Sequence, residues 1–535
     1  MKLHTRWFAV PTALLALIGC TAQSSSGPET PDAPDAGSDA PAADPPGQVQ
    51  TDKGAVVGQS DGTITAFLGV PYAAPPLGQL RWRPPQPHAA WSEPFSATAL
   101  GPACAQSEGG IGQTGPFSED CLTVNVWTPR TGAAAKAPVM VFIHGGFFVH
   151  GSSNQDTYDG RALAAQGVVM VSMNYRLGAL GFLAHPALTA EDEHASSGNT
   201  ALLDQREALR WVQTNIAAFG GDPSNVTVFG ESAGAMTICA LVVSPLGSGL
   251  FHRAIGESGS CAIFTTPLHA TTASAGAESL GVAVAAALGC DTASDVLGCM
   301  RGKSADEVIA AAPMSLNGVS LQPNIDGYVL PEAPSAALAA GRVNPLDGMI
   351  GGTNQDEATL FTRALVIDTE AQYEVAVTRL LPSFAADALA LYPAAAFPTP
   401  KDAYNTLFTD VIFVCPIRGQ LRGIAARGTS AYLYQLTRPT RSDELGVYHG
   451  SELPFVFGNL SLSSGMSAAD RAFSNQVIGY WTRFAATGDP NGASATPWAP
   501  HTAASDAYLD LGAQITAATG LRRETCDAIA QWRAP

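Results

Sequence analysis

The sequence predicts an α/β protein in which a large, mostly parallel sheet carries helices on both faces. Three observations lead to this prediction. Stretches typical of β-strands alternate with helical patterns between residues 137 and 257. A glycine-rich turn joins one such strand directly to an apolar helix at residues 226–241. The chain of 535 residues is 46% hydrophobic and only 14% charged, a composition that allows a large core.

The first 20 residues have the pattern of an export signal. A basic start precedes the apolar stretch 7–18, which is too short to remain as a membrane-spanning helix. Residues 17–20 read Leu-Ile-Gly-Cys and look like a bacterial lipobox, so we expect Cys20 to be lipidated and to become the mature N-terminus. Thr21, in place of Asp, favours an outer-membrane-anchored lipoprotein. Ordinary secretion from the bacterial cell is the alternative.

Residues 21–48 are mostly Ser, Pro, Ala, Gly and Asp, with almost no apolar surface to bury. We expect a disordered tether that carries one folded body at 49–535. The formal net charge of −18 argues against a nucleic-acid partner, because phosphates would be repelled. No later stretch is long and apolar enough to be a membrane span. Contact with a membrane is therefore expected only through a lipid on Cys20.

Strands and helices alternate along the folded body. Strands are predicted at 137–143 and 167–174, where β-rich runs are bounded by turn residues. Residues 199–219 predict an amphipathic helix, with Asn199 as its N-cap and Gly220 as its stop. Further strands are predicted at 226–229, 253–257, 347–352 and 431–436.

Residues 226–234 carry the strongest chemical signal, Val-Thr-Val-Phe-Gly-Glu-Ser-Ala-Gly. A strand, a tight Gly-x-Ser-x-Gly turn and a helix are the context of a nucleophile elbow, which makes Ser232 the predicted nucleophile. Gly230 and Gly234 have no side chain, so they leave room for the backbone segments that pass close to each other at this turn. The helix N-terminus would stabilise negative charge beside the serine. Glu231 either tunes this site or has a structural hydrogen-bonding role.

A serine hydroxyl needs a base to accept its proton. In the chain order typical of such elbows, the acid and then the histidine follow the serine. His252 and His269 leave little room for an intervening strand, and His501 lies in a polar segment. His449 follows the strand at 431–436 and has a glycine beside it, so it is the predicted base.

The acid is expected in a loop at the carboxyl end of a strand. Asp356 and Glu357 both follow the predicted strand 347–352, and their position alone does not separate them. Asp326 is a third candidate, although its Asp-Gly sequence is more typical of a turn. The acid would orient the ring of His449 and stabilise its cation.

Residues 144–148 read His-Gly-Gly-Phe-Phe and follow the strand at 137–143. Such a loop offers free backbone amides to an oxyanion, here from Gly146 and Phe147, with Ala233 as a third donor. The cysteines and histidines of the sequence do not have the spacing of metal ligands. Catalysis by a serine, a histidine and an acid needs no cofactor, so none is expected.

Nine cysteines are present, and removal of Cys20 leaves eight. An even number in an exported chain indicates disulfides. The suggested pairs are Cys104–Cys121, Cys290–Cys299 and Cys415–Cys526, while Cys239 and Cys261 either pair or remain thiols.

Seven motifs occur in a fixed order, at residues 69–73, 118–125, 174–178, 204–209, 219–223, 230–234 and 488–491. Through them the chain resembles the type-B carboxylesterase family, from about residue 52 to 532. This family includes cholinesterases, carboxylesterases and bacterial para-nitrobenzyl esterases.

The resemblance implies an α/β-hydrolase fold and a serine hydrolase that cleaves small carboxylic esters through an acyl-enzyme. It implies Ser232 as nucleophile, His449 as base and Glu357, rather than Asp356, as acid. It also supports the three suggested disulfides, and it leaves the oligomeric state open. The alternatives are a catalytically silent adhesion or binding protein of the same fold, or a hydrolase of lipids or carbamates.

The chain departs from the family pattern at two places. The third position of the oxyanion loop, usually Gly or Ala, is Phe147, whose side chain should narrow or redirect the pocket. The loop 104–121 lacks the Trp that binds quaternary ammonium in cholinesterases, so a choline ester is not expected. Phe264, Phe361 and Phe455 are candidates for an acyl or alcohol pocket, although core packing is the usual role of phenylalanine.

Overall fold

The computed structural model describes residues 47–533, apart from 109–115, 273, 317, 440–444 and 461–465. The predicted export signal, with Cys20, and the tether up to residue 46 lie outside the described residues. The chain from Asp44 to Pro535 forms one compact unit. Within its described part, no helix combines the length and the apolar character that a membrane crossing requires.

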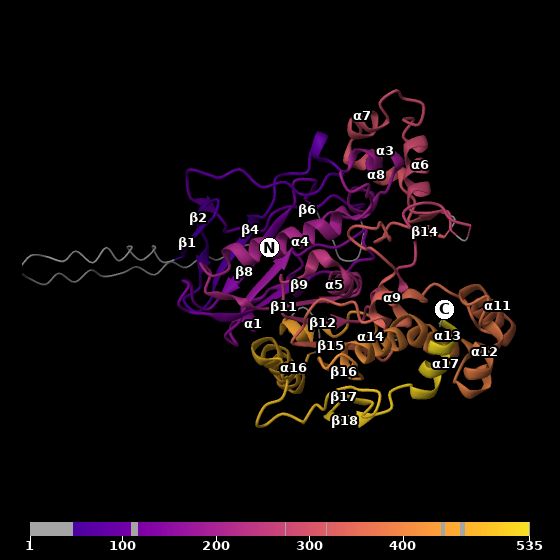
Figure 1. Ribbon diagram of the computed structural model, residues 1–535. Helices are drawn as coiled ribbons and strands as arrows, with labels where there is room; N and C mark the ends of the chain where they lie inside the picture. Colours follow the sequence, from indigo (N-terminus) through magenta and orange to yellow (C-terminus); the bar gives the residue numbers. More distant parts are fainter. Residues whose placement is uncertain are drawn as a thin grey trace, which may run out of the picture. The chain divides into compact units, whose positions relative to one another are not determined.

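In the described part of the chain, the central sheet has 11 strands in the order β18-β17-β16-β15-β12-β11-β9-β10-β8-β4-β3 (Figure 1). The strands from β17 to β10 pair in parallel, and the pairs at both ends are antiparallel. The predicted mostly parallel sheet is therefore confirmed. The parallel strands are β9 (Ala137–Ile143), β10 (Val169–Met173), β11 (Gly221–Glu231), β12 (Arg253–Glu257), β15 (Gly348–Asn354), β16 (Ser430–Leu436) and β17 (Ala507–Leu511).

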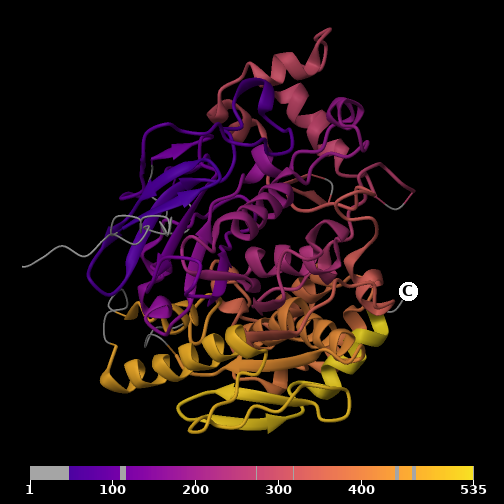
Figure 2. The same cartoon turned by 60° about the vertical axis from the view of Figure 1, so that its left-hand side comes forward.

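The outer strands place the two ends of the folded body at opposite edges of the sheet. In Figure 2 the indigo amino-terminal strands and the yellow carboxy-terminal hairpin lie far apart. The outer strands are β3 (Gln59–Ser60), β4 (Thr65–Pro71), β8 (Thr123–Thr128) and β18 (Ile515–Thr519).

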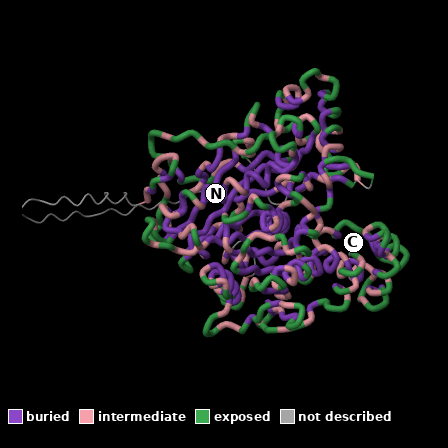
Figure 3. Tube along the Cα trace, in the orientation of Figure 1, coloured by how far each residue is buried: buried purple, intermediate pink, exposed green. Residues whose placement is uncertain are grey.

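The middle of the sheet is covered on both faces. Along β9, Val139, Val141 and Ile143 belong to one buried cluster, while Met140 and Phe142 belong to another. This split follows from the two-residue period of a strand, and continuous apolar runs are expected where both faces are covered. Figure 3 shows the buried residues concentrated in the sheet and in the helices beside it.

Different helices supply the two clusters. The first cluster contains side chains of α4 (Thr200–Asn215), α5 (Ala233–Val243) and α14 (Cys415–Ala425). The second contains side chains of α1 (Arg161–Ala164), α15 (Leu453–Phe457) and α16 (Ala468–Thr487). The helices thus form a layer on each face, which is the α/β architecture that the alternating pattern predicts.

The helix predicted at 199–219 begins where expected but ends earlier in the structure. Asn199 stands at the N-cap position of α4, but its side chain makes no capping bond. Instead it bonds the backbone of Asn324, accepting from N at 3.0 Å and donating to O at 2.8 Å. The helix ends at Asn215, before Gly220, whose φ of 87° belongs to the turn into β11. Asn199 is thus the N-cap residue as predicted, but a tertiary contact takes its side-chain amide away from the helix.

Candidate active site

Ser232 occupies a sharp turn between β11 and α5. Its φ of 56° and ψ of −124° lie outside the regions that non-glycine residues normally adopt. A side chain on Gly234 would place Cβ only 2.0 Å from the carbonyl oxygen of Ile143. The turn therefore packs directly against the carboxyl end of β9, which requires glycine at this position. Ser232 is 91% buried, with 9% of its surface exposed.

His449 and Glu357 meet from neighbouring strands. Glu357 follows β15, His449 lies in the loop after β16, and these strands pair in parallel, so the two loops share one edge of the sheet. Nδ1 of His449 lies 2.6 Å from Oε2 of Glu357. The other carboxylate oxygen, Oε1, accepts hydrogen bonds from the Ser258 hydroxyl at 2.6 Å and from the backbone amide of Asn354 at 2.7 Å. Glu357 is therefore fully buried yet held in one orientation.

The opposite side of the His449 ring faces the elbow. Nε2 lies 3.1 Å from Oε1 of Glu231, the residue before Ser232. The two atoms are not aligned for a hydrogen bond, and Nε2 has no hydrogen-bond partner among the described residues. A bond from the serine hydroxyl to its base often tightens only when substrate is in place.

Two carboxylates determine the charge of His449. Burial acts to lower the pKa of His449, but Glu231 and Glu357 outweigh it and raise the pKa above the usual 6.5. Burial raises the pKa of Glu231 to about 7, while the charge of His449 opposes this shift. Both carboxylates therefore stabilise the protonated form of His449.

Two further glutamates belong to this buried acidic region. Burial raises the pKa of Glu257 to about 8, although Trp481 donates to its Oε1 at 2.6 Å. Burial, followed by the charge of Glu231, raises the pKa of Glu452 well above its ordinary value. Glu452 lies three residues after His449, but no pattern in the sequence distinguished it from a surface residue.

Residues 145–147 lie directly against the elbow. A Cβ on Gly145 would lie 2.7 Å from Oε2 of Glu231 and 2.9 Å from Cβ of Ser232. In the described residues the amides of Gly146 and Phe147 have no protein acceptor. The amide of Ala233 begins α5, where helical amides lack an intrahelical partner. Three free donors are thus available at the turn that carries Ser232.

His144 supports this loop from behind. Its ring stacks on Tyr175 with centroids 4.5 Å apart, and the Tyr175 hydroxyl donates to its carbonyl oxygen at 2.8 Å. Burial lowers the pKa of His144 to about 4, so the ring is neutral at pH 7. A neutral, stacked ring holds the first residue of the loop in place without adding charge.

Ser232 opens into an apolar inner cavity of about 330 Å³. Phe361 and Phe413 contact the ring of His449, with centroid distances of 4.8 Å and 5.0 Å. Among the three phenylalanines that the sequence suggested, Phe361 lines this cavity, whereas Phe264 and Phe455 are fully buried. The other apolar lining residues include Phe147, Phe148, Met236, Ile263, Phe408 and Ile412. No pattern marked Phe408 or Phe413.

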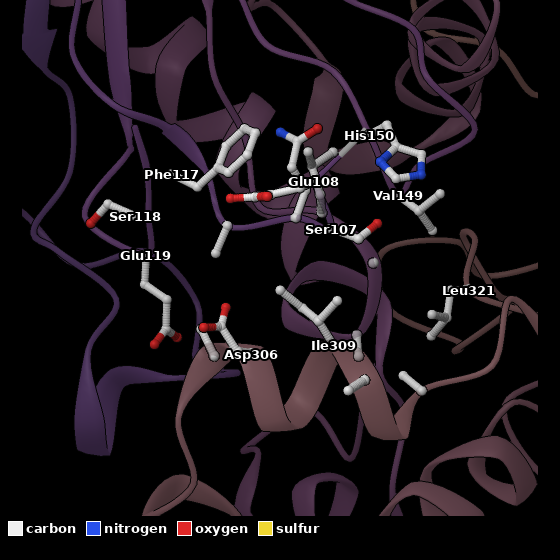
Figure 4. A pocket seen from close by; sticks show the side chains of 18 of the residues that line it. Ser107, Glu108, Phe117, Ser118, Glu119, Val149, His150, Asp306, Ile309 and Leu321 are labelled. Carbon is white, nitrogen blue, oxygen red and sulfur yellow. The ribbon is translucent and has the colours of Figure 1, made fainter. Parts of the chain in front are cut away.

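A larger outer cavity of about 880 Å³ lies next to the inner one (Figure 4). Val149, Met314 and Leu321 line both cavities, so the two share a wall. Figure 4 shows the carboxylates of Glu119 and Asp306 at one end of the outer cavity and Val149 and Leu321 at the other. Glu119 is paired with Nε of Arg81 at 2.7 Å.

The other candidate acids and bases have separate partners. Asp356 accepts from the amide of Val447 at 2.8 Å, and Asp326 from that of Leu330 at 2.8 Å, which makes Asp326 a turn residue. Nδ1 of His501 lies 2.9 Å from the carbonyl oxygen of Ala507, at the start of β17. In the described part of the chain, no group of three or more His, Cys, Asp or Glu is arranged for a metal ion.

Among the residues that the structure describes, four disulfides occur. Cys239 and Cys261, which the sequence left open, are bonded and join α5 to the loop after β12. The others are Cys104–Cys121, Cys290–Cys299 and Cys415–Cys526.

Comparison with known proteins agrees with this geometry. The model of the carboxylesterase family matches residues 45–529. This chain belongs to the carboxylesterase family. Members of the family are α/β-hydrolases that cleave carboxylic esters, and the expected fold and enzyme class are therefore confirmed.

Its relatives are named as esterases. Fumonisin B1 esterase of Sphingopyxis macrogoltabida is 36% identical over 88% of this chain and 87% of the relative. Para-nitrobenzyl esterase of Bacillus subtilis is 36% identical over 88% of this chain and 95% of the relative. Carboxylesterase 1D of Mus musculus is 35% identical over 91% and 94%. These relatives support ester hydrolysis, and they offer no support for a silent binding protein.

Proposed function

We propose that Ser232, His449 and Glu357 carry out the ester hydrolysis that the family performs. The observation that carries this proposal is the 2.6 Å contact between the buried side chains of His449 and Glu357, beside a strained serine elbow. Glu357 holds Nδ1, so that Nε2 is free to accept the proton of the serine hydroxyl.

The reaction then follows two matched steps. Ser232 Oγ attacks the ester carbonyl carbon and passes its proton to His449, while the amides of Gly146, Phe147 and Ala233 stabilise the oxyanion. His449 returns the proton to the leaving alcohol, and an acyl-enzyme remains on Ser232. Water then attacks this ester with His449 as base, which releases the acid and restores the serine.

The cavities support an uncharged ester as the substrate. The inner cavity of about 330 Å³ is lined mostly by apolar side chains, so it suits a short apolar group. The outer cavity has room for the part of a larger substrate that lies far from the ester bond. The carboxylates of Glu108 and Asp306, which line this cavity, would repel a negatively charged substrate.

Replacement of the nucleophile tests this function. Ser232→Ala is expected to reduce kcat for para-nitrophenyl butyrate by at least about 10⁴-fold, because the nucleophile is lost. A fluorophosphonate probe should label Ser232 in the wild type, as mass spectrometry of the tryptic peptide would show. Ser505→Ala, a change in an exposed turn, serves as the control. Retained turnover in Ser232→Ala would rule out the assignment.

We also propose that the enzyme is exported from a bacterial cell and anchored by a lipid on Cys20. The lipobox-like Leu-Ile-Gly-Cys and the polar stretch 21–48 support this location. Cys20→Ser should move esterase activity from the membrane pellet to the soluble fraction after export. Activity that stays in the pellet of this variant would exclude a lipid anchor at Cys20.

A further inference from the structure

Two successive phenylalanines in the oxyanion loop adopt left-handed backbone conformations. The φ angles are 57° for Phe147 and 65° for Phe148. This region is unfavourable for residues that carry a Cβ, and such strain persists only where the surroundings impose it. Each of these two side chains therefore needs a physical reason to be present.

Core packing explains Phe148. Its side chain is 6% exposed and packs against Phe182 and Phe264, with ring centroids 5.4 Å and 5.8 Å away. Core packing does not explain Phe147, which is 44% exposed. The Phe147 ring instead lines the inner cavity together with Ser232.

The ring of Phe147 is part of an aromatic wall that reaches the base. It meets Phe361 edge-on, with centroids 5.4 Å apart and an interplanar angle of 87°. Phe361 in turn stacks on Phe413, at 5.8 Å and 12°. Both Phe361 and Phe413 contact the ring of His449. The wall therefore borders the imidazole side of the cavity.

The imidazole side is where the alcohol leaves. His449 must reach the ester oxygen to protonate it, so the alcohol part of the substrate lies next to this ring. We propose that Phe147 is a specificity-determining residue for the leaving alcohol, which it selects together with Phe361 and Phe413. Planar aromatic alcohols are favoured, and alcohols branched at the carbon that bears the oxygen are excluded. This inference rests on the proposed roles of Ser232 and His449.

The shape and chemistry of the aromatic wall explain both the preference for aromatic alcohols and the exclusion of branched alcohols. An aromatic alcohol can pair edge-on or offset with the exposed face of Phe147, an arrangement that aromatic rings prefer. A branched carbon needs width close to His449, and the Phe147 ring, which rests edge-on against Phe361, takes up part of that width.

Mutation can distinguish the role of the Phe147 side chain from the role of its backbone amide. The oxyanion donor is the backbone amide, which remains when the ring is removed. A change in alcohol preference therefore reports on the ring, whereas an equal change for all esters reports on the oxyanion donor.

The experiment compares ethyl, benzyl and tert-butyl butyrate, which share one acyl group, by pH-stat titration. In Phe147→Ala, kcat/KM is expected to fall about tenfold for the benzyl ester, rise about tenfold for the tert-butyl ester and change little for the ethyl ester. Phe147→Leu keeps bulk without an aromatic face, so the benzyl ester should lose rate while the tert-butyl ester stays poor. Val366→Ala, at a side chain outside the inner cavity, should change none of the three rates.

Equal changes for all three esters in Phe147→Ala and Phe147→Leu would overturn the proposal. The same holds if the ratio of benzyl to tert-butyl rates stays constant in both variants. A wild-type enzyme that hydrolyses no ester, with no probe adduct on Ser232, would instead refute the proposed function itself.

Discussion

At the scale of single residues, His449 is held between two carboxylates with different environments. Glu357 accepts three hydrogen bonds, from the His449 ring, the Ser258 hydroxyl and the Asn354 backbone amide, which hold its carboxylate in one orientation. Glu231 is buried, and the structure gives its Oε1 no hydrogen-bond partner among the described residues. The first carboxylate orients the ring, and the second adds a negative charge beside the nitrogen that must accept a proton.

This arrangement predicts how Glu231→Gln changes the pH profile. The neutral imidazole is the active base, so kcat/KM rises as pH increases through the pKa of His449. Because Glu231 raises that pKa, the wild-type acid limb should have its midpoint above 6.5. Loss of the negative charge destabilises the imidazolium, so the limb should move to lower pH.

The profile of kcat/KM for para-nitrophenyl butyrate measures this shift. Glu332→Gln, which removes a partly exposed carboxylate paired with Arg342 outside the active site, is the control and should leave the limb in place. A limb that stays in place in Glu231→Gln as well would show that Glu231 does not influence the base.

At the scale of elements, the elbow and the oxyanion loop are fitted to each other. The start of α5 contacts the end of β9 so closely that a Cβ on Gly234 would lie 2.0 Å from Ile143 O and 2.9 Å from His144 O. The backbone at the start of α5 is thus in direct contact with the backbone at the end of β9. The position of the oxyanion donors therefore depends on a residue that itself takes no part in the reaction.

Alanine at two helical glycines tests this fit. In Gly234→Ala the clash with backbone must displace the loop, so stability should fall by about 1–3 kcal/mol and kcat should fall with it. In Gly419→Ala, within α14, the added Cβ meets nothing within 4 Å. That variant should gain about 0.5–1 kcal/mol, because alanine has the higher helix propensity. Urea unfolding measures both, and equal effects on stability would contradict the close fit.

At the scale of the whole molecule, the disulfides close loops of very different length. Cys415–Cys526 has a sequence separation of 111 residues and joins α14 to the carboxy-terminal helix α17 (Arg523–Arg533). Cys290–Cys299 has a separation of only 9 residues. A bond that closes a longer loop removes more conformational entropy from the unfolded chain.

Loss of the long-range bond should therefore destabilise the protein more. Replacing Cys415 and Cys526 by serine is expected to lower the free energy of unfolding by about 4–5 kcal/mol, against about 2–3 kcal/mol for Cys290 and Cys299. Urea unfolding of the two double variants under oxidising conditions measures this difference. The reverse order would show that strain or residual structure, rather than loop length, dominates.

Much of the fold follows from local patterns. The strand at 253–257 was predicted with the bounds of β12, and the elbow around Ser232 was predicted from nine consecutive residues. Such elements depend on neighbours in the chain, through periodicity and through the backbone freedom of glycine. The role of the Asn199 side chain at the start of α4 was less predictable, because it bonds a residue 125 positions away.

Taken by itself, the sequence determined the order of strands and helices, the elbow and the choice of His449 as candidate base. Position in the chain left Asp356 and Glu357 both open, and only the family resemblance pointed to Glu357. The tertiary structure adds the physical difference between them, because these adjacent residues after β15 contact different partners, the Val447 amide and the His449 ring. It also decided that Cys239 bonds Cys261 and that Phe413 reaches the base. The physical reason is that periodicity acts between near neighbours in the chain, whereas these contacts depend on how separate strands and helices pack together.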